Sequence, residues 1–207
     1  EDLYKKGQYF FEQKEYEEAY QWLNRSANQN HAPAQNSLGL LCDYGKGCER
    51  NPLSALDWYQ RAGNHAQALF NLGMLYFLGD GIEPDENKAF SCFERSANEN
   101  ETRAQVFLGI LYENGRGVTQ DLSRAVSGYR KAAWQGDAFA QFHLARMYYH
   151  GKGVGLDHGQ ALHWYLKAAD QGYSLAQYNL GRMYLNGEGT QIDIENAIHW
   201  FQKAAEQ

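Results

Sequence analysis

The sequence has 207 residues, of which 43% are hydrophobic and 21% charged, a composition sufficient for a folded core. Its 19 Lys and Arg residues and 25 Asp and Glu residues give a net charge of −6, with both signs interspersed and no basic block. This balance disfavours a nucleic acid or an anionic membrane as partner. No apolar run approaches the roughly 20 residues that span a bilayer, and no charged-then-apolar leader precedes Glu1.

Residues 1–30 form a shorter unit than those that follow. Gly7 and Ala19 are 12 residues apart, whereas the corresponding Gly39 and Ala55 are 16 apart. The shorter spacing is typical of a tetratricopeptide helix pair. The residues that fit that pattern are Gly7, Phe10, Tyr16, Ala19 and Leu23. The sequence therefore predicts a tetratricopeptide-like opening unit.

The remainder of the chain repeats with one period. A Gly-x-Gly motif recurs at steps of 34, 36, 36 and 36 residues, beginning at Gly45, Gly79, Gly115, Gly151 and Gly187. A Leu-Gly pair, which is Leu144-Ala145 in the fourth unit, and a later Ala keep the same steps. Such a period is typical of stacked supersecondary units. We therefore expect one repeat domain over 1–207, with five full repeats at 32–65, 66–100, 102–136, 138–172 and 174–207.

The last repeat indicates that each unit is a helix pair. Ala176, Leu180 and Met183 share one face of a first helix, and Gly187 ends it, because Gly reaches left-handed backbone angles without strain. Each second helix is expected to start at an Asn or Asp that caps free backbone N–H groups. These residues are Asn51, Asp85, Asp121, Asp157 and Asp193. Replacing a turn glycine such as Gly153 by Ala is expected to cost on the order of 1 kcal/mol.

Two stretches of this repeat carry a family resemblance. AQYNLGRMYLNGEG at 176–189, followed by AIHWFQKAA at 197–205, resembles the Sel-1-like repeat, a longer-turned relative of the tetratricopeptide. The resemblance implies an all-α fold, an α/α superhelical solenoid of Sel-1-like repeats behind the tetratricopeptide-like first unit. It also implies an adaptor or scaffold without catalytic residues, as in bacterial signalling, host interaction, envelope assembly and eukaryotic protein quality control.

The three cysteines differ from the stapled pattern of the cysteine-rich branch of that family. Cys42 occupies a Tyr slot, Cys92 a Trp slot and Cys48 an aliphatic slot, so all three are interpreted as small buried hydrophobes. Their odd number disfavours a full disulfide framework and favours the cytoplasm. A periplasmic or secreted location stays open if a leader was removed.

The patterns that suggest chemistry have simpler explanations. The glycine loops end helices instead of following strands, so they are interpreted as turns and not as phosphate cradles. His143 and His150 lie seven residues apart on one helical face, but no third metal ligand is evident, and His163 and His199 occupy an outward polar slot. With no nucleophile beside a base, the prediction is a protein that is not an enzyme and has no catalytic residues, metal or cofactor.

The first helices are expected to line a concave groove that binds a partner protein or peptide. Their outward slots vary between repeats while the core slots do not, and several are apolar, which favours an interaction surface over residues that merely tolerate solvent. The predicted partner-binding residues are Phe70, Met74, Phe77, Phe142, Arg146, Tyr149, Tyr178 and Arg182. The leading hypothesis is a protein–protein interaction scaffold. The alternative is a regulatory or immunity-type subunit that inhibits a partner enzyme by capping it.

Arg146 and Arg182 occupy one slot in successive repeats, where earlier repeats carry Leu40, Met74 and Ile110. Two guanidinium groups side by side are expected to grip an acidic segment or a C-terminal carboxylate. Reversing both charges is expected to weaken binding while the melting temperature stays nearly unchanged.

The last helix is expected to leave an uncovered edge. No polar capping helix follows Trp200 and Phe201, although terminal repeats normally need such a cap. This pattern predicts either a longer natural chain or end-to-end self-association.

Overall fold

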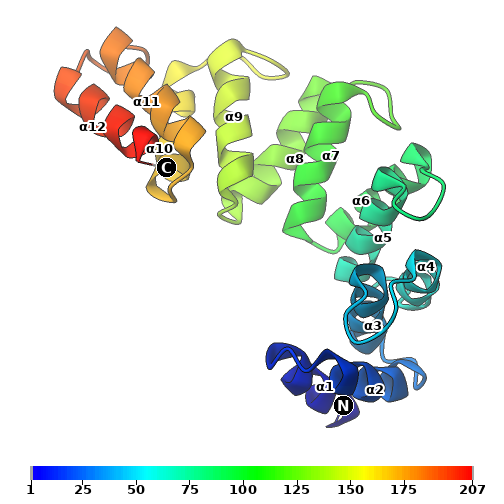
Figure 1. The fold of residues 1–207 in the computed structure, drawn as a ribbon. Coiled ribbons are helices and arrows are strands. Elements are labelled where there is room, and N and C mark those ends of the chain that lie inside the picture. The colour runs from blue at the N-terminus through cyan, green and yellow to red at the C-terminus, as the bar shows by residue number, and fades with distance from the viewer. Residues whose placement is uncertain (1, 207) are drawn as a thin grey trace. The chain divides into compact units, whose positions relative to one another are not determined.

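The structure is a computed structural model that describes residues 2–206. Over this range it contains twelve α-helices and no strand (Figure 1). The chain forms two compact units, one up to Ala104 and one from Gln105 onward. None of the helices within residues 2–206 is both long and apolar enough to cross a lipid bilayer.

Successive antiparallel helix pairs make up both units. The helices of the first unit are α1 (Asp2–Glu12), α2 (Tyr16–Ala27), α3 (Ala32–Tyr44), α4 (Pro52–Arg61), α5 (Ala66–Leu78) and α6 (Glu86–Asn98). Those of the second unit are α7 (Thr102–Asn114), which begins just before the boundary, α8 (Leu122–Trp134), α9 (Ala138–His150), α10 (His158–Asp170), α11 (Ser174–Asn186) and α12 (Ile194–Ala205). The all-α prediction is confirmed.

The helix boundaries follow from local chemistry. Each second helix of the five full repeats has its predicted Asn or Asp at the N-cap, where the side chain accepts a hydrogen bond from a backbone N–H three residues on. Gly151 ends α9 at a φ of +63°, in the left-handed region where a side chain would be strained. The first pair lacks such a turn, because only three residues separate α1 from α2.

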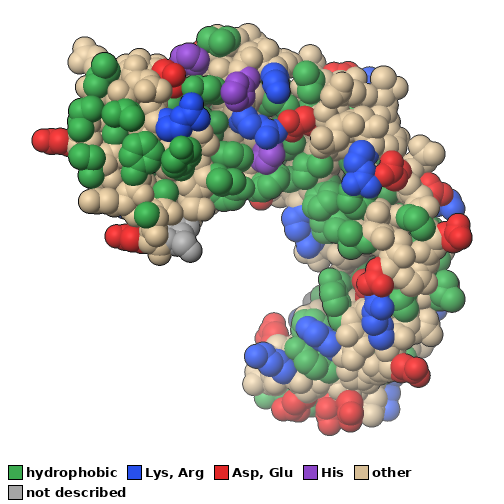
Figure 2. Space-filling view, turned by 45° about the horizontal axis from the view of Figure 1, so that its top comes forward, with side chains coloured by type: hydrophobic (Ala, Val, Ile, Leu, Met, Phe, Trp, Pro, Cys, Tyr) green, Lys and Arg blue, Asp and Glu red, His purple; other side chains and the backbone are tan. Residues whose placement is uncertain are grey.

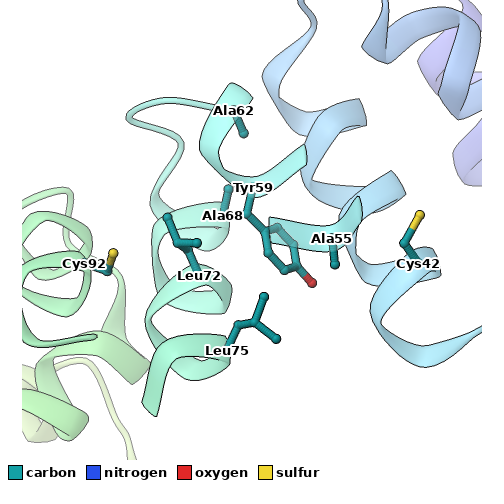
Figure 3. Packing of buried hydrophobic residues seen from close by; sticks show 8 residues of the cluster. All are labelled: Cys42, Ala55, Tyr59, Ala62, Ala68, Leu72, Leu75 and Cys92. Carbon is teal, nitrogen blue, oxygen red and sulfur yellow. The ribbon is translucent and has the colours of Figure 1, made fainter. Parts of the chain in front are cut away.

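The core lies between the helices of each pair and between neighbouring pairs. In the first unit a Tyr59 ring packs among Ala55, Leu72 and Leu75 (Figure 3). Gly39 is required here because a Cβ at this position would lie 2.5 Å from a Tyr59 ring carbon. The Leu-Gly anchor of the sequence thus marks the place where an aromatic ring of the second helix meets the first helix.

The cysteines are free thiols, and two of the three are buried. Cys42 and Cys92 lie in the core as predicted, whereas Cys48 is only half-buried and its Sγ donates to the Leu41 carbonyl oxygen at 3.6 Å. Cys48 thus packs against the core but is only partly buried, because the residue belongs to the turn after α3.

This difference predicts selective labelling. Burial raises the pKa of Cys42 to about 12, with a contribution from Cys48, and burial raises the pKa of Cys92 to about 11. A disulfide reagent at pH 8 should therefore modify Cys48 quickly and the other two only after unfolding, since the thiolate is the reacting form. Mass spectrometry of labelled peptides checks the order, and rapid labelling of Cys92 in the folded protein would contradict it.

Candidate partner-binding surface

The predicted partner-binding residues divide between the two units and differ in accessibility. Phe70 and Phe142 are largely buried, with 6% and 8% of their surface exposed. The ring of Phe70 lies 5.7 Å from that of Phe93, and the ring of Phe142 lies 5.1 Å from that of Tyr173. These two side chains therefore offer a partner much less surface than their outward slots suggest.

In the first unit, Phe70 and Met74 of α5 line a pocket of about 360 Å³. Its walls are Leu40, Asp43, Tyr44, Arg50, Tyr59, Phe70, Asn71, Met74, Leu75, Leu78, Asp80 and Arg103. Phe77 does not line this pocket, and its ring lies 6.4 Å from that of Phe93. The structure thus brings together two of the three residues predicted in this unit.

In the second unit, Arg146 is already paired with a carboxylate. Its guanidinium donates to Oε1 of Glu113 on α7, and the Tyr129 hydroxyl of α8 donates to Oε2 of Glu113 at 2.7 Å. The Nδ1 atom of His143 lies 3.8 Å from the same Oε2. We call Glu113 and these three side chains the Glu113 cluster. The cluster joins α7, α8 and α9.

The electrostatics of the Glu113 cluster follow from its geometry. His143, the Tyr129 hydroxyl and the Arg146 charge lower the pKa of Glu113 to about 2, although burial alone raises it. Only 17% of the Glu113 side chain is exposed, so these partners replace most of the water that a carboxylate needs. Arg146 is therefore not a free arm. We therefore now expect a charge reversal at Arg146 to lower the stability of the fold, whereas the sequence predicted a nearly unchanged melting temperature.

Arg182 on α11 is exposed and has no ion pair within residues 2–206. Its charge acts on Tyr149 and His150 of α9, so these groups lie in one neighbourhood. The hydroxyl of Tyr149 donates to Oε2 of Glu188 at 2.8 Å. Burial lowers the pKa of His150, and the positive charges of Lys152, Arg146 and Arg182 lower it further. This part of the surface is positively charged. The hydroxyl of the neighbouring Tyr149 is already bound to Glu188.

Tyr178 lies one helical turn before Arg182, so both side chains project from one face of α11. Tyr178 is 51% exposed. It borders a shallow apolar depression of about 450 Å³ lined by Ser174, Leu175, Tyr178, Phe201, Ala204 and Ala205. Figure 2 shows Lys, Arg and His side chains lying between hydrophobic ones on one face of the α9–α12 part. Aromatic and cationic surface therefore adjoin on α11.

The edge formed by α12 differs in one respect from the expectation. Trp200 is buried, with 6% of its surface exposed, because it packs within its own unit, while Phe201 is half-buried. Exposed apolar residues of α11 and α12 include Leu175, Tyr178, Leu185, Ile194 and Ile198.

The histidines do not assemble a metal site. No group of three His, Cys, Asp or Glu side chains with metal-binding geometry occurs within residues 2–206. His143 is instead enclosed by aromatic rings, with ring centroids 4.1 Å from Phe139 and 5.0 Å from Tyr129. His163 and His199 are exposed, in agreement with their outward slot.

Together, these features define a tandem helix-pair repeat protein. The sequence pattern of the Sel1 repeat family matches six consecutive segments at 2–31, 32–65, 66–101, 102–137, 138–173 and 174–207. The chain belongs to the Sel1 repeat family, and its fold is a TPR-like helical solenoid. The first segment, which is tetratricopeptide-like in its short turn, matches the same family pattern.

Two solved structures resemble the chain over most of its length. A Sel1 repeat protein from Oxalobacter formigenes is 32% identical, with a TM-score of 0.91 over 100% of this chain and 83% of that one. The protective antigen c5321 of uropathogenic Escherichia coli, which displays an SLR fold, is 34% identical, with a TM-score of 0.89 over 92% of this chain. The match spans 41% of c5321.

A shorter sequence match is to a yeast protein. Chitin synthase regulator SKT5 of Saccharomyces cerevisiae is 44% identical over 50 residues, which are 24% of this chain and 7% of SKT5. Sel1 repeat proteins generally mediate protein–protein interactions, and their scaffolds are typically non-enzymatic.

Proposed function

We propose that the chain is a scaffold whose second unit binds a partner protein on the outward face of α11 and the adjoining part of α9. The observation that carries this proposal is an exposed, unpaired Arg182 one turn from an exposed Tyr178 within residues 2–206. Aromatic and arginine side chains contribute most of the binding energy in many protein interfaces. The expected ligand is a segment with an acidic side chain or a C-terminal carboxylate.

The sequence predicts that two arginines bind one carboxylate, and we assign this role to Arg182 alone. Arg146 is already paired with Glu113. Of the two arginines, the Arg182 guanidinium is therefore the one that is free to form two parallel hydrogen bonds with a carboxylate of the partner. Tyr178 offers an aromatic surface beside it, and Tyr149 offers a ring whose hydroxyl is held by Glu188. An anionic end held next to an aromatic side chain suits a short peptide motif better than a broad, flat interface.

The test begins with a pull-down using the tagged chain and identification of the captured protein by mass spectrometry. Arg182→Glu should then weaken binding of that protein at least tenfold, because one attraction becomes a repulsion, and wild-type binding should fall with added salt. The matched control is Lys167→Glu, the same charge change on the exposed side of α10. Unchanged binding of Arg182→Glu, or an equal loss in Lys167→Glu, would contradict the proposed contact.

A further inference from the structure

Asp43 of the first unit and Glu113 of the second occupy the same slot, two residues before the first glycine of the turn. Glu113 contacts the second helix of its own pair and the first helix of the next pair, and Asp43 lines a pocket with residues of the corresponding helices, α4 and α5. Glu113 accepts hydrogen bonds there from Tyr129 and Arg146, and the Nδ1 atom of His143 lies 3.8 Å from it. The Glu113 cluster therefore shows how hydrogen bonds and a positive charge can stabilise a carboxylate in this slot.

The site at Asp43 has a tyrosine equivalent to Tyr129 but no positively charged residue in the place of Arg146. Tyr59 corresponds to Tyr129, but Asn71 replaces His143 and Met74 replaces Arg146. The Asn71 amide is turned to Asn36, to whose Oδ1 it donates at 2.9 Å. The thioether of Met74 has no charge to offer. The Asp43 site thus lacks the group that neutralises Glu113.

One buried polar group at this site lacks a hydrogen-bond partner in the described part of the chain. The Tyr59 side chain is fully buried, and its hydroxyl oxygen, which is red in Figure 3, has no hydrogen-bond partner within residues 2–206. The Asp43 carboxylate lies near enough to Tyr59 that each of the two groups shifts the pKa of the other. Burial raises the pKa of Asp43, while the charge of Arg50 opposes this rise. A buried hydroxyl without a partner is costly, and such groups call for an explanation.

The other charged groups of the pocket are engaged elsewhere. Arg50 donates from Nη2 to Oδ2 of Asp80 at 2.6 Å and from Nε to the backbone oxygen of Asp43 at 2.9 Å. Arg103 donates to Oε1 of Glu101 at 2.7 Å, and its guanidinium carbon lies 4.3 Å from the centre of the Phe70 ring. Because both arginines already form ion pairs with other carboxylates, the Asp43 carboxylate has only the nearby charge of Arg50 to offset its own and forms no ion pair in the described part of the chain.

We propose that the pocket of the first unit receives the guanidinium of an arginine side chain from a bound protein. The guanidinium donates two hydrogen bonds to the half-buried Asp43 carboxylate, as its fixed fork of N–H donors allows. Its aliphatic stem lies against Leu40 and Met74, which line the same pocket. The volume of about 360 Å³ is at the small end of the range for ligand pockets, which is roughly 300–1,000 Å³.

This inference deepens the protein-binding function proposed above, but it uses another surface and can be tested without the partner. The probe is N-acetyl-arginine methylamide, titrated into the isotope-labelled full chain and followed by backbone amide shifts. Saturable shifts are expected around Asp43, Tyr59 and Met74. The citrulline analogue, which has the same shape without the charge, should bind at least fivefold more weakly. Equal binding of both probes would overturn the proposal.

Free L-arginine distinguishes an arginine side chain from a small metabolite. If free arginine bound more tightly than the capped probe, the pocket would serve a small molecule and the protein-partner assignment would be wrong. Asp43→Asn should lower the affinity for the capped probe at least fivefold, and a variant that kept the full affinity would also overturn the proposal.

Met74→Arg supplies the missing cation from within the chain, as Arg146 does at Glu113. This variant should abolish binding of the probe because its own guanidinium fills the site. The matched control, Met74→Leu, places in this slot the residue found at position 40 and should bind the probe as the wild type does. Full probe binding by a folded Met74→Arg variant would show that the probe does not bind at Asp43.

Discussion

Gly153→Ala is expected to lower the free energy of unfolding by about 3 kcal/mol, well beyond the cost of backbone strain alone. Gly153 has a φ of +69°, which a Cβ disfavours by about 1 kcal/mol. The added Cβ would also lie 2.2 Å from the Leu122 carbonyl oxygen, so the start of α8 must move. Overpacking of this kind costs roughly 1–3 kcal/mol more. The value of about 1 kcal/mol expected from sequence omits this contact.

Gly63→Ala is the matched control for that measurement. Gly63 has a similar φ of +64°, but no atom lies within 4 Å of the position that its Cβ would occupy. Only the strain of about 1 kcal/mol should therefore appear. Urea unfolding followed by helical circular dichroism compares the two variants with the wild type. Equal losses in both would show that the turn after α9 adjusts freely and that the contact with Leu122 has no energetic role.

Arg146→Glu is expected to lower the free energy of unfolding by about 3 kcal/mol, because it places a second carboxylate beside Glu113. Removing Arg146 leaves the Glu113 carboxylate, which is only 17% exposed, with less compensation for its charge. Arg182→Glu is the control, since Arg182 is exposed and has no ion pair in the described part of the chain; it should change stability by less than about 0.5 kcal/mol. Similar urea midpoints for wild type and Arg146→Glu would contradict a stabilising Glu113 cluster.

The Glu113 cluster also predicts a pH dependence of stability. The folded-state pKa of Glu113 is lowered from 4.5 to about 2, so the folded state binds its proton less readily than the unfolded state does. The resulting stabilisation is complete above about pH 5 and disappears as the pH falls to 2. It amounts to about 3 kcal/mol. Glu113→Gln should be less stable than the wild type at pH 6, and the two curves should converge near pH 2. Parallel curves would contradict the assignment.

The identity and placement of the helix pairs were readable from the sequence because they depend on local chemistry. Asn51 and Asp85 cap helices through atoms three residues away, and the turn glycines end helices through their own backbone angles. The repeated Ala and Leu-Gly anchors predicted the core because each repeat buries the same face. The family resemblance rested on the same residues, and it is confirmed.

The accessibility of the outward slots was not readable in the same way. Phe70 and Phe142 sit in slots that a single helix exposes, but rings from neighbouring helices cover them. Cys48 sits in an aliphatic slot, yet the path of its turn leaves it half-exposed. Burial depends on which neighbour reaches over a residue, and the spacing within one helix does not contain that information.

The sequence by itself determined the fold class and the helix ends, and it predicted the slots from which a partner would be contacted. The tertiary structure alone decided which charged residues in those slots are engaged. Arg146 and Arg182 are equivalent in sequence, but a carboxylate 33 residues away engages the first while the second has no ion pair in the described chain. Glu113 and Asp43 also occupy equivalent slots in the sequence, but only Glu113 has an arginine of the next helix pair as its partner within residues 2–206. Charge compensation is a property of three helices meeting at one point, and long-range contacts of this kind leave no periodic signal in a single sequence.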